Sequence, residues 1–322
     1  MKITVILCTY NRCQTLGKAL DSIAVSILPD SVEWEVLVVD NNSNDQTWKV
    51  VEDFCRRYPG RFRYLLEPQQ GLSYARNAAI RQAQGDVLVF TDDDVIVEDT
   101  WLQNLTEPLR HGEWAGSGGR VRPACTFVPP RWLSLEAYSL GPLAIFDRGP
   151  SAGELAEPPF GANMAFRRQM FEKYGTFRTD LGRCGKNLLS NEDTEFGRRL
   201  LAAGERLRYE PSAVVYHPVP ESRMQKQYFL AWWFAKGRAD SRELGVRPDS
   251  KRSVAGIPLL LFRRLAVRTL RWLFAVEPSR RFSCKLTVSA TLGEMLECYR
   301  WSRNRIRERT PSEGLPTPRA TK

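Results

Sequence analysis

Short apolar runs alternate with stretches of helical spacing along the first hundred residues. The apolar runs, rich in Val, Ile and aromatic residues, predict strands at residues 3–7, 34–39, 62–66 and 86–90. Apolar residues at helical spacing predict helices at residues 14–27, 46–57 and 73–82. This alternation with short links predicts a parallel sheet covered by helices, the doubly wound α/β architecture. Ligands of such sheets bind beyond the carboxyl ends of the strands.

The pattern changes after residue 121. From about residue 122 to residue 159, Pro, Gly and aromatic residues interleave, which predicts a long loop or lid. Regular patterns then predict a strand at 161–167, a helix at 191–203, strands near 207–210 and 213–217, and helices at 223–244, 257–275 and 286–307. We expect an α/β domain over 1–245, a helical extension over 246–309 and a disordered tail over 310–322.

Composition and cysteine spacing limit the classes of protein to which this chain can belong. With 322 residues, 43% of them hydrophobic and 11% aromatic, the chain can bury a core and is not expected to be disordered. No run of about 18 uncharged apolar residues occurs, and the N-terminus is too short and polar for a secretory signal. The seven cysteines form no CxxC pair, so spacing does not support zinc. We expect reduced thiols in a cytoplasmic protein.

The net charge of +10 is concentrated in the helical extension. Residues 1–250 hold 31 Lys and Arg against 32 Asp and Glu, whereas residues 251–310 hold 14 against 4. Arginines interleaved with Leu, Val and Trp predict a helix that lies in a bilayer interface, with a helix packed on the catalytic domain as the alternative. We therefore expect residues 255–309 to permit peripheral contact with a membrane surface. Nucleic acid is not an expected partner, because no recognition module accompanies the basic stretch.

The most specific local signal is the run Asp92-Asp93-Asp94 at the end of a predicted strand. Adjacent carboxylates repel one another unless a cation lies among them. A divalent metal, Mg²⁺ or Mn²⁺, is the natural partner and also binds phosphates. The alternative is a solvated acidic turn ahead of a helix.

Polar residues also follow the other predicted strands. The first strand ends in Thr9-Tyr10-Asn11-Arg12, Asp40 closes the second, and Arg76 follows an abrupt turn at Gly71. Each alone is no more than an ordinary loop signal. Together with the acidic run they describe a nucleotide that lies across the strand ends with its diphosphate on a metal.

These residues resemble the family 2 glycosyltransferases of GT-A fold. The resemblance rests on seven segments in order: Val5–Arg12, Val38–Ser43, Gly71–Asn77, Phe90–Asp94, Gly161–Arg167, Asn191–Asp193 with Arg199 and Gly204 downstream, and Tyr216–His217. It covers about residues 3–245 and implies a Rossmann-like, mixed and mostly parallel sheet flanked by helices. The helical extension lies outside it.

The resemblance implies a role for each matching position. Thr9, Tyr10, Asn11, Arg12 and Asp40 would hold the nucleoside of the donor. Arg76 would contact the base or the diphosphate. Asp92 and Asp94 match the ends of the DxD motif and, with His217, would bind the metal, Asp92 lying nearer the ribose and Asp93 between them. Gly161 and Asn163 would line the pocket. The alternative for His217 is a strand-end histidine held before Pro218.

Asp193 matches the catalytic base of the family's "ED" motif, with Glu192 as the fallback. The base would take a proton from the acceptor hydroxyl as the anomeric configuration inverts. The alternative reading is structural, because Ser190-Asn-Glu-Asp193 also matches a capping box at a helix start.

The resemblance implies transfer of one sugar from a nucleoside-diphosphate sugar, UDP-sugar above all, to a glycan. A lipid-linked acceptor at the cytoplasmic face of the inner membrane is a hypothesis that rests only on the basic helices of the extension. Processive synthesis is not expected, because Gln225 opens a segment without an Arg before Trp232 or Trp233, unlike the Q-x-x-R-W motif. Two alternatives are a protein that binds nucleotide-sugar or glycan without turnover, and a sugar nucleotidyltransferase. The latter should carry a Gly-rich phosphate loop, which residues 8–17 lack.

Overall fold

The computed structural model describes residues 1–134, 136, 140–185, 187–245 and 252–309. Its centre is a nine-stranded sheet. The strands are β1 (Lys2–Thr9), β2 (Glu33–Asp40), β3 (Phe62–Leu66), β4 (Val87–Asp92), β5 (Ile96–Val97), β6 (Gly116–Pro123), β7 (Gly153–Glu154), β8 (Asn163–Arg167) and β9 (Leu207–His217). Their order is β3-β2-β1-β4-β8-β6-β9-β5, with β7 paired to β9.

The sheet is mixed, with a parallel half built from the N-terminal strands. β1 pairs in parallel with β2 and β4, and β2 pairs in parallel with β3. β8 then runs antiparallel between β4 and β6, and β6 pairs in parallel with β9. The carboxyl ends of β1, β2, β4, β6 and β9 therefore meet at one edge of the sheet. The predicted α/β sheet is confirmed.

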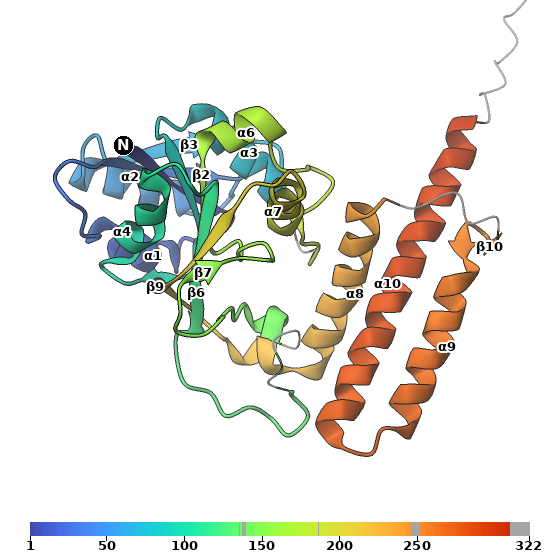
Figure 1. Ribbon diagram of the computed structural model, residues 1–322. Helices are drawn as coiled ribbons and strands as arrows, with labels where there is room; N and C mark the ends of the chain where they lie inside the picture. The colour runs from blue at the N-terminus through green and yellow to red at the C-terminus, as the bar shows by residue number, and fades with distance from the viewer. Residues whose placement is uncertain (135, 137–139, 186, 246–251, 310–322) are drawn as a thin grey trace, which may run out of the picture.

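Helices cover both faces of this sheet (Figure 1). They are α1 (Leu16–Ala24), α2 (Thr47–Arg57), α3 (Leu72–Gln82), α4 (Trp101–Thr106), α6 (Arg168–Tyr174) and α7 (Glu192–Ala202). Side chains of successive strand residues point to opposite faces, so Val5 enters one core and Ile6 the other. The first core includes Leu20 of α1 and Trp101 of α4, and the second includes Phe196 of α7.

Three further helices form a separate layer: α8 (Lys226–Glu243), α9 (Leu259–Phe274) and α10 (Pro278–Arg309). They lie side by side, with α8 toward the sheet and α9 farthest from it (Figure 1). Short elements complete the chain: the 3-10 helices η1 (Glu107–Arg110), η2 (Gly141–Leu143) and η3 (Glu221–Met224), and the hairpin of β10 (Ser253–Val254) and β11 (Ile257–Pro258). Leu143 of η2 packs with Phe229 of α8 and Leu286 of α10 in a third apolar cluster.

Several predicted boundaries differ from the structure. The two strands predicted near 207–210 and 213–217 form the single strand β9, whose register with β6 shifts between Gly119 and Arg120. β6 was not predicted, because its Gly-rich sequence lacks apolar alternation. β8 starts at Asn163 instead of 161, α1 is shorter than predicted, and α10 starts at Pro278 instead of 286. The predicted disorder of 310–322 and the junction at 246–251 lie outside the described residues.

Close packing of α8 on α10 depends on two glycines. A Cβ atom on Gly237 would collide with the carbonyl oxygen of Ala290, and one on Gly293 would collide with that of Phe234. Since both obstacles are backbone atoms, neither can move aside like a flexible side chain.

We predict that Gly237→Ala lowers the free energy of unfolding by about 1–3 kcal/mol, because the added methyl overpacks the contact with α10. Gly17→Ala is the matched control in α1. There the new Cβ meets only Val50 Cγ1 at 3.9 Å, and the higher helix propensity of Ala should raise stability by roughly 0.5 kcal/mol. Denaturant unfolding of both variants measures the difference. Equal effects of the two substitutions would contradict this account of the α8–α10 contact.

Candidate active site

The carboxyl edge of the sheet opens into a cavity of about 380 Å³. It is lined by residues from the ends of β1 and β4, from α3, from the start of α7 and from the segment between β9 and α8. The predicted site residues in its lining are Thr9, Tyr10, Arg12, Arg76, Asp92, Asp93, Asp94, Gly161, Glu192, Asp193 and His217. The fold thus brings together residues that lie up to two hundred positions apart in the sequence.

Asp92, Asp94 and His217 form a cluster that can hold a metal. One potential ligand atom of each lies within 4.8 Å of those of the other two. His217 Nδ1 is 2.8 Å from the carbonyl oxygen of Pro218. A carbonyl oxygen only accepts, so Nδ1 carries a proton, and Nε2 is the ring atom that can offer a lone pair to a metal. That atom lies 3.5 Å from Asp94 Oδ1, so the contact with Pro218 orients the ring for a ligand role.

Two arginines balance part of the negative charge of the acidic run. Arg12 Nη2 lies 3.8 Å and Arg223 Nη2 lies 4.0 Å from Asp94 Oδ2. Arg12 Nε also lies 4.0 Å from Asp93 Oδ1. Burial and the neighbouring Asp94 nevertheless raise the pKa of Asp93 to about 7. Because uncompensated negative charge remains here, the site favours a further cation.

Arg76 connects the acidic run to the start of α7. Its guanidinium is buried, with Nη1 donating to Glu192 Oε1 at 2.8 Å and Nη2 lying 3.9 Å from Asp92 Oδ1. Nη2 also donates to the carbonyl oxygen of Gly161 at 3.3 Å. Burial and the neighbouring Asp193 raise the pKa of Glu192 to about 7, although Arg76 acts in the opposite direction.

Asp193 faces the cavity from the first turn of α7. Its Oδ1 accepts from its neighbour Thr194 N at 2.7 Å. Its Oδ2 lies against Gly161, where a Cβ atom would be only 2.5 Å away. Gly161 is therefore the residue type that leaves room for this carboxylate.

The capping alternative for Asp193 is not what the structure shows. The residue that caps α7 is Asn191, in the left-handed conformation with φ of 78°, and no side-chain hydrogen bond caps the helix. Ser190 Oγ donates to Asn191 Oδ1 at 3.2 Å. The reciprocal bonds of a capping box are absent from this helix start, and while Oδ1 of Asp193 accepts from Thr194, its Oδ2 faces Gly161 at the cavity.

Three predicted site residues do not line the cavity. Asn163 is fully buried and donates to the carbonyl oxygens of Arg120 and Ala213, while its Oδ1 accepts from Trp101 Nε1 at 2.8 Å. The expectation that Asn163 lines the pocket is wrong, because its amide joins strands β6, β8 and β9 instead.

Asn11 and Asp40 act on the loops beside the cavity. Asn11 has a positive φ of 53°, and its Oδ1 accepts from Asn44 N at 2.9 Å. Asp40 is buried, with Oδ1 accepting from Ser43 N and Oδ2 from Tyr64 Oη. Both side chains therefore fix the shape of the turn that follows β2.

The structure adds lining residues that the sequence motifs did not indicate. Arg223, Trp232 and Lys236 come from η3 and α8, and Arg183 comes from the loop before α7. Gly141, Pro142 and Ala144 show that the long segment predicted as a loop or lid reaches the cavity. For Arg223 the sequence did offer one signal, its position, because Arg223 follows the predicted metal ligand His217 by only six residues.

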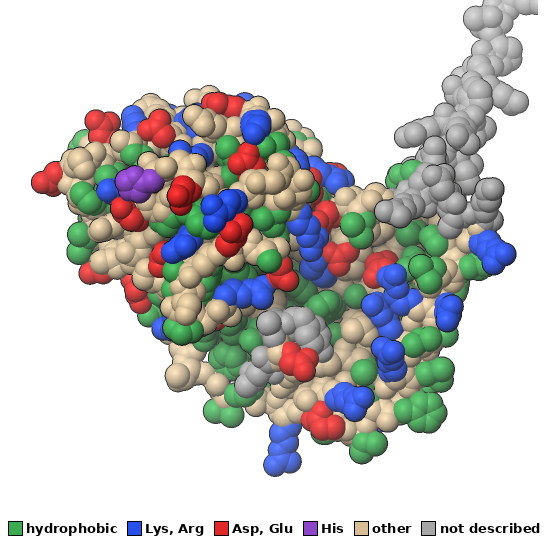
Figure 2. Space-filling view, viewed as in Figure 1, with side chains coloured by type: hydrophobic (Ala, Val, Ile, Leu, Met, Phe, Trp, Pro, Cys, Tyr) green, Lys and Arg blue, Asp and Glu red, His purple; other side chains and the backbone are tan. Residues whose placement is uncertain are grey.

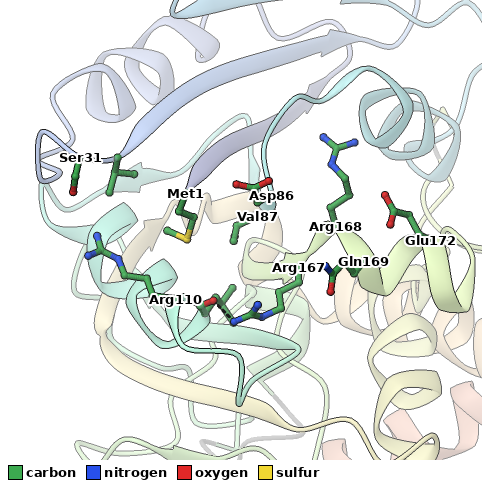
Figure 3. A pocket seen from close by; sticks show the side chains of 11 residues that line it. Met1, Ser31, Asp86, Val87, Arg110, Arg167, Arg168, Gln169 and Glu172 are labelled. Carbon is green, nitrogen blue, oxygen red and sulfur yellow. Dashed lines mark hydrogen bonds between the residues drawn. The ribbon is translucent and has the colours of Figure 1, made fainter.

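A second cavity, of about 570 Å³, lies at the opposite edge of the sheet (Figure 3). Its wall includes Met1 and Asp86 near the amino ends of β1 and β4. Arg167 and Arg168 also line it, but their guanidinium groups donate to backbone carbonyl oxygens. We assign the functional site to the other cavity, because ligands of such sheets bind at the carboxyl ends of the strands.

Comparison with known proteins identifies the family. The model described as "Glycosyl transferase family 2" matches residues 4–175. The succinoglycan biosynthesis protein ExoM of Rhizobium meliloti (strain 1021) is 30% identical over 80% of this chain and 80% of its own length. The chain belongs to glycosyl transferase family 2. The resemblance seen in the sequence motifs is confirmed.

Other glycosyltransferases are similar to this family member. The glucosyl-dolichyl phosphate glucuronosyltransferase of Haloferax volcanii is 27% identical over 72% of this chain and 75% of its own length. The mannosyltransferase PcManGT from Pyrobaculum calidifontis was solved in complex with GDP-Man and Mn²⁺. It matches this chain with a TM-score of 0.57 at 20% sequence identity, and the match covers 96% of this chain and 75% of the mannosyltransferase chain. The GT-A fold is confirmed, and the chain is a glycosyltransferase. The family model includes the acidic run but ends before Asp193 and His217.

We predict that Arg76→Met destabilises this glycosyltransferase by about 3–5 kcal/mol at pH 8, because the buried Glu192 loses its counterion. A carboxyl group whose pKa is raised on folding, here from 4.5 to about 7, supplies stability in its protonated form, and that stability is lost as the pH rises through the raised pKa. The destabilisation caused by Arg76→Met should therefore be smaller at pH 5 than at pH 8. Denaturant unfolding at both pH values measures it.

Arg56→Met is the control, because the ion pair between Arg56 and Asp53 is exposed and should contribute no more than about 0.5 kcal/mol at either pH. An effect of Arg76→Met as small as that of the control would show that Glu192 needs no counterion.

Proposed function

We propose that this chain transfers a single sugar from a nucleoside-diphosphate sugar, with UDP-sugar as the first candidate, to a hydroxyl group of a glycan or lipid-linked acceptor, with inversion. The observation that carries the proposal is that one cavity holds both the Asp193 carboxylate and the cluster of Asp92, Asp94 and His217. Asp193 would accept a proton, and a metal bound by Asp92, Asp94 and His217 would neutralise the negative charge of the leaving diphosphate.

Asp92, Asp94 and His217 would hold a divalent metal, Mn²⁺ or Mg²⁺. Two carboxylates and an imidazole whose Nε2 carries the lone pair suit Mn²⁺, and carboxylates also suit Mg²⁺. When bound, the metal supplies positive charge to the diphosphate that leaves the sugar. The structural neighbour with bound GDP-Man and Mn²⁺ supports this assignment.

The nucleotide would lie across the ends of β1 and β4. Thr9, Tyr10 and Arg12 line that part of the cavity and offer hydroxyl and guanidinium groups. Arg76 is held by Glu192 and by the carbonyl oxygen of Gly161, so it presents a fixed positive charge beside Asp92. Asn11 and Asp40 would contribute indirectly, through the loop that they shape.

Asp193 would act as the base. Its Oδ2 takes the proton of the acceptor hydroxyl as the acceptor oxygen bonds to the anomeric carbon. The bond from that carbon to the diphosphate oxygen breaks on the opposite face, and its electron pair leaves with the nucleoside diphosphate. The absence of a side chain at Gly161 leaves room for Oδ2 of Asp193 at the edge of the cavity.

We place the transfer at the cytoplasmic face of a membrane, and two observations support a lipid-linked acceptor and the transfer of one sugar, respectively. The first is the name of the haloarchaeal relative, which includes a glucosyl-dolichyl phosphate. The second is that Trp232 and Trp233 lack the preceding Arg of processive members. Trp232 and Lys236 of α8 line the cavity and would contact the acceptor.

We predict that Asp193→Asn lowers turnover of the donor sugar about a hundredfold or more, the usual loss when a general base is removed. Donor affinity should change less than about threefold, because the residue acts on the acceptor. Glu195→Gln, in the same turn of α7 but paired with Arg199, is the matched control and should keep turnover. Release of nucleoside diphosphate from a panel of UDP-, GDP- and dTDP-sugars, together with calorimetric donor binding, measures both quantities.

Unchanged turnover in Asp193→Asn, with a loss in Glu192→Gln, would move the base to Glu192. Donor binding without turnover by the wild type, with any acceptor supplied, would instead indicate a binding protein.

A further inference from the structure

Helix α9 exposes an apolar face to solvent. The side chains of Leu260, Leu270 and Leu273 are each more than half exposed, and Phe274 is 80% exposed. The exposed large hydrophobic residues of this region are Leu259, Leu260, Phe262, Val267, Leu270, Leu273, Phe274 and Val276. Leu259 and Phe262 are three residues apart, as are Val267, Leu270 and Leu273, and Phe274 follows Leu270 by four, so these side chains share the outward side of the helix; Val276 follows the end of α9.

The opposite side of α9, which faces α10, carries polar contacts. Arg264 Nη1 donates to Glu294 Oε2 at 2.7 Å, and Arg268 Nη1 donates to Thr291 Oγ1 at 2.6 Å. Leu261 is buried beside them and packs, with Leu265, against Met295 and Cys298 of α10. A helix on the surface of a water-soluble bundle has the reverse arrangement, with apolar residues inward and charges outward. The outward face of α9 therefore lacks a partner that its composition requires.

The charges beside this face are mostly positive, and Glu277, which accepts from Ser279 and Arg280 at the start of α10, is the one acidic residue between residues 251 and 281. The sequence has no Asp or Glu from residue 251 to residue 276. Arg263 and Arg271 are exposed on α9, and Arg280 and Arg281 are exposed at the start of α10. Figure 2 shows hydrophobic side chains along the edge of the molecule where α9 lies, with Lys and Arg side chains next to them.

We propose that the outward face of α9 docks onto an anionic lipid bilayer. The apolar side chains would enter the acyl boundary while Arg263 and Arg271 meet lipid phosphates. At about 1.5 Å per residue, the 16 residues of α9 extend over roughly 24 Å in the plane of the surface. In the described part of the chain, no helix is sufficiently long and apolar to cross a membrane.

A second copy of the chain fits this face less well. Two α9 helices packed face to face would bring Arg263 and Arg271 close to the same residues of the other copy, with no acidic residue of α9 to compensate. Like charges in a desolvated contact are destabilising, whereas anionic headgroups neutralise them. Charge complementarity therefore selects the bilayer. The proposal rests on α9 alone, and it names the surface at which the proposed transfer to a lipid-linked acceptor would take place.

The test is flotation of the full chain with large unilamellar vesicles of phosphatidylglycerol and phosphatidylcholine, or of phosphatidylcholine alone. The wild type should float with the anionic vesicles, and raising the salt concentration should weaken binding. Leu270→Ser with Phe274→Ser should lower the partition coefficient at least about tenfold. Val25→Ser with Ile27→Ser is the matched control, because both residues are exposed on the catalytic domain, and it should bind as the wild type does.

Thermal unfolding and calorimetric nucleotide binding show whether the α9 variant remains folded with an intact donor site; both should be unchanged. Equal flotation of wild type and α9 variant would overturn the proposal, as would absence of flotation with anionic vesicles. A dimer that forms without vesicles and dissociates in the α9 variant would also overturn it and assign the face to a second copy. Loss of activity alone, with flotation intact, would count against the proposed reaction and would leave the proposal for the outward face of α9 unchanged.

Discussion

Repulsion among carboxylates is the constraint on which the site depends. The carboxyl edge of the sheet gathers Asp92, Asp93 and Asp94 from the end of β4 and Glu192 and Asp193 from the start of α7. Such groups resist ionisation together unless cations separate them. Burial first, and the charge of a neighbouring carboxylate second, raise the pKa values of Asp93 and Glu192 to about 7. Arg76 separates the two groups of acids by pairing with Glu192 and approaching Asp92. The negative charge that remains around Asp94 favours a cation, which we propose to be a divalent metal.

The helical layer takes part in building this site. Asn191, directly before Glu192, donates from Nδ2 to Asp240 at 2.7 Å and to Glu243 at 2.6 Å, both on α8. α8 is joined in turn to α10, where Glu297 accepts from Arg238 and Arg242. The start of α7 is thus held by a helix that also packs closely on α10 through Gly237. The outward face of α9 and the cavity consequently belong to one connected framework.

The sequence predicted best what local patterns encode. Alternating apolar runs gave the parallel half of the sheet, and the polar residues at strand ends gave most of the cavity lining. The sequence did not predict the roles of residues that depend on tertiary contacts. The amide of Asn163 bonds to β6, to β9 and to Trp101 of α4, and Trp232 reaches the cavity only because α8 packs beside it. The sequence predicted an interfacial helix in this region, but it could not specify which side of α9 faces outward, because the pairing of Arg264 with Glu294 is a long-range contact that helical spacing does not specify.

The most direct test of the central claim, that Asp92, Asp94 and His217 bind a metal together with the donor's diphosphate, is calorimetric titration of UDP, GDP and dTDP with and without Mn²⁺. We expect one nucleotide to bind the wild type only with the metal. That binding should disappear in Asp94→Asn and persist in Asp53→Asn, which alters an exposed carboxylate of α2. Binding that needs no metal, or that survives in Asp94→Asn, would contradict the account and leave the acidic run as a solvated turn.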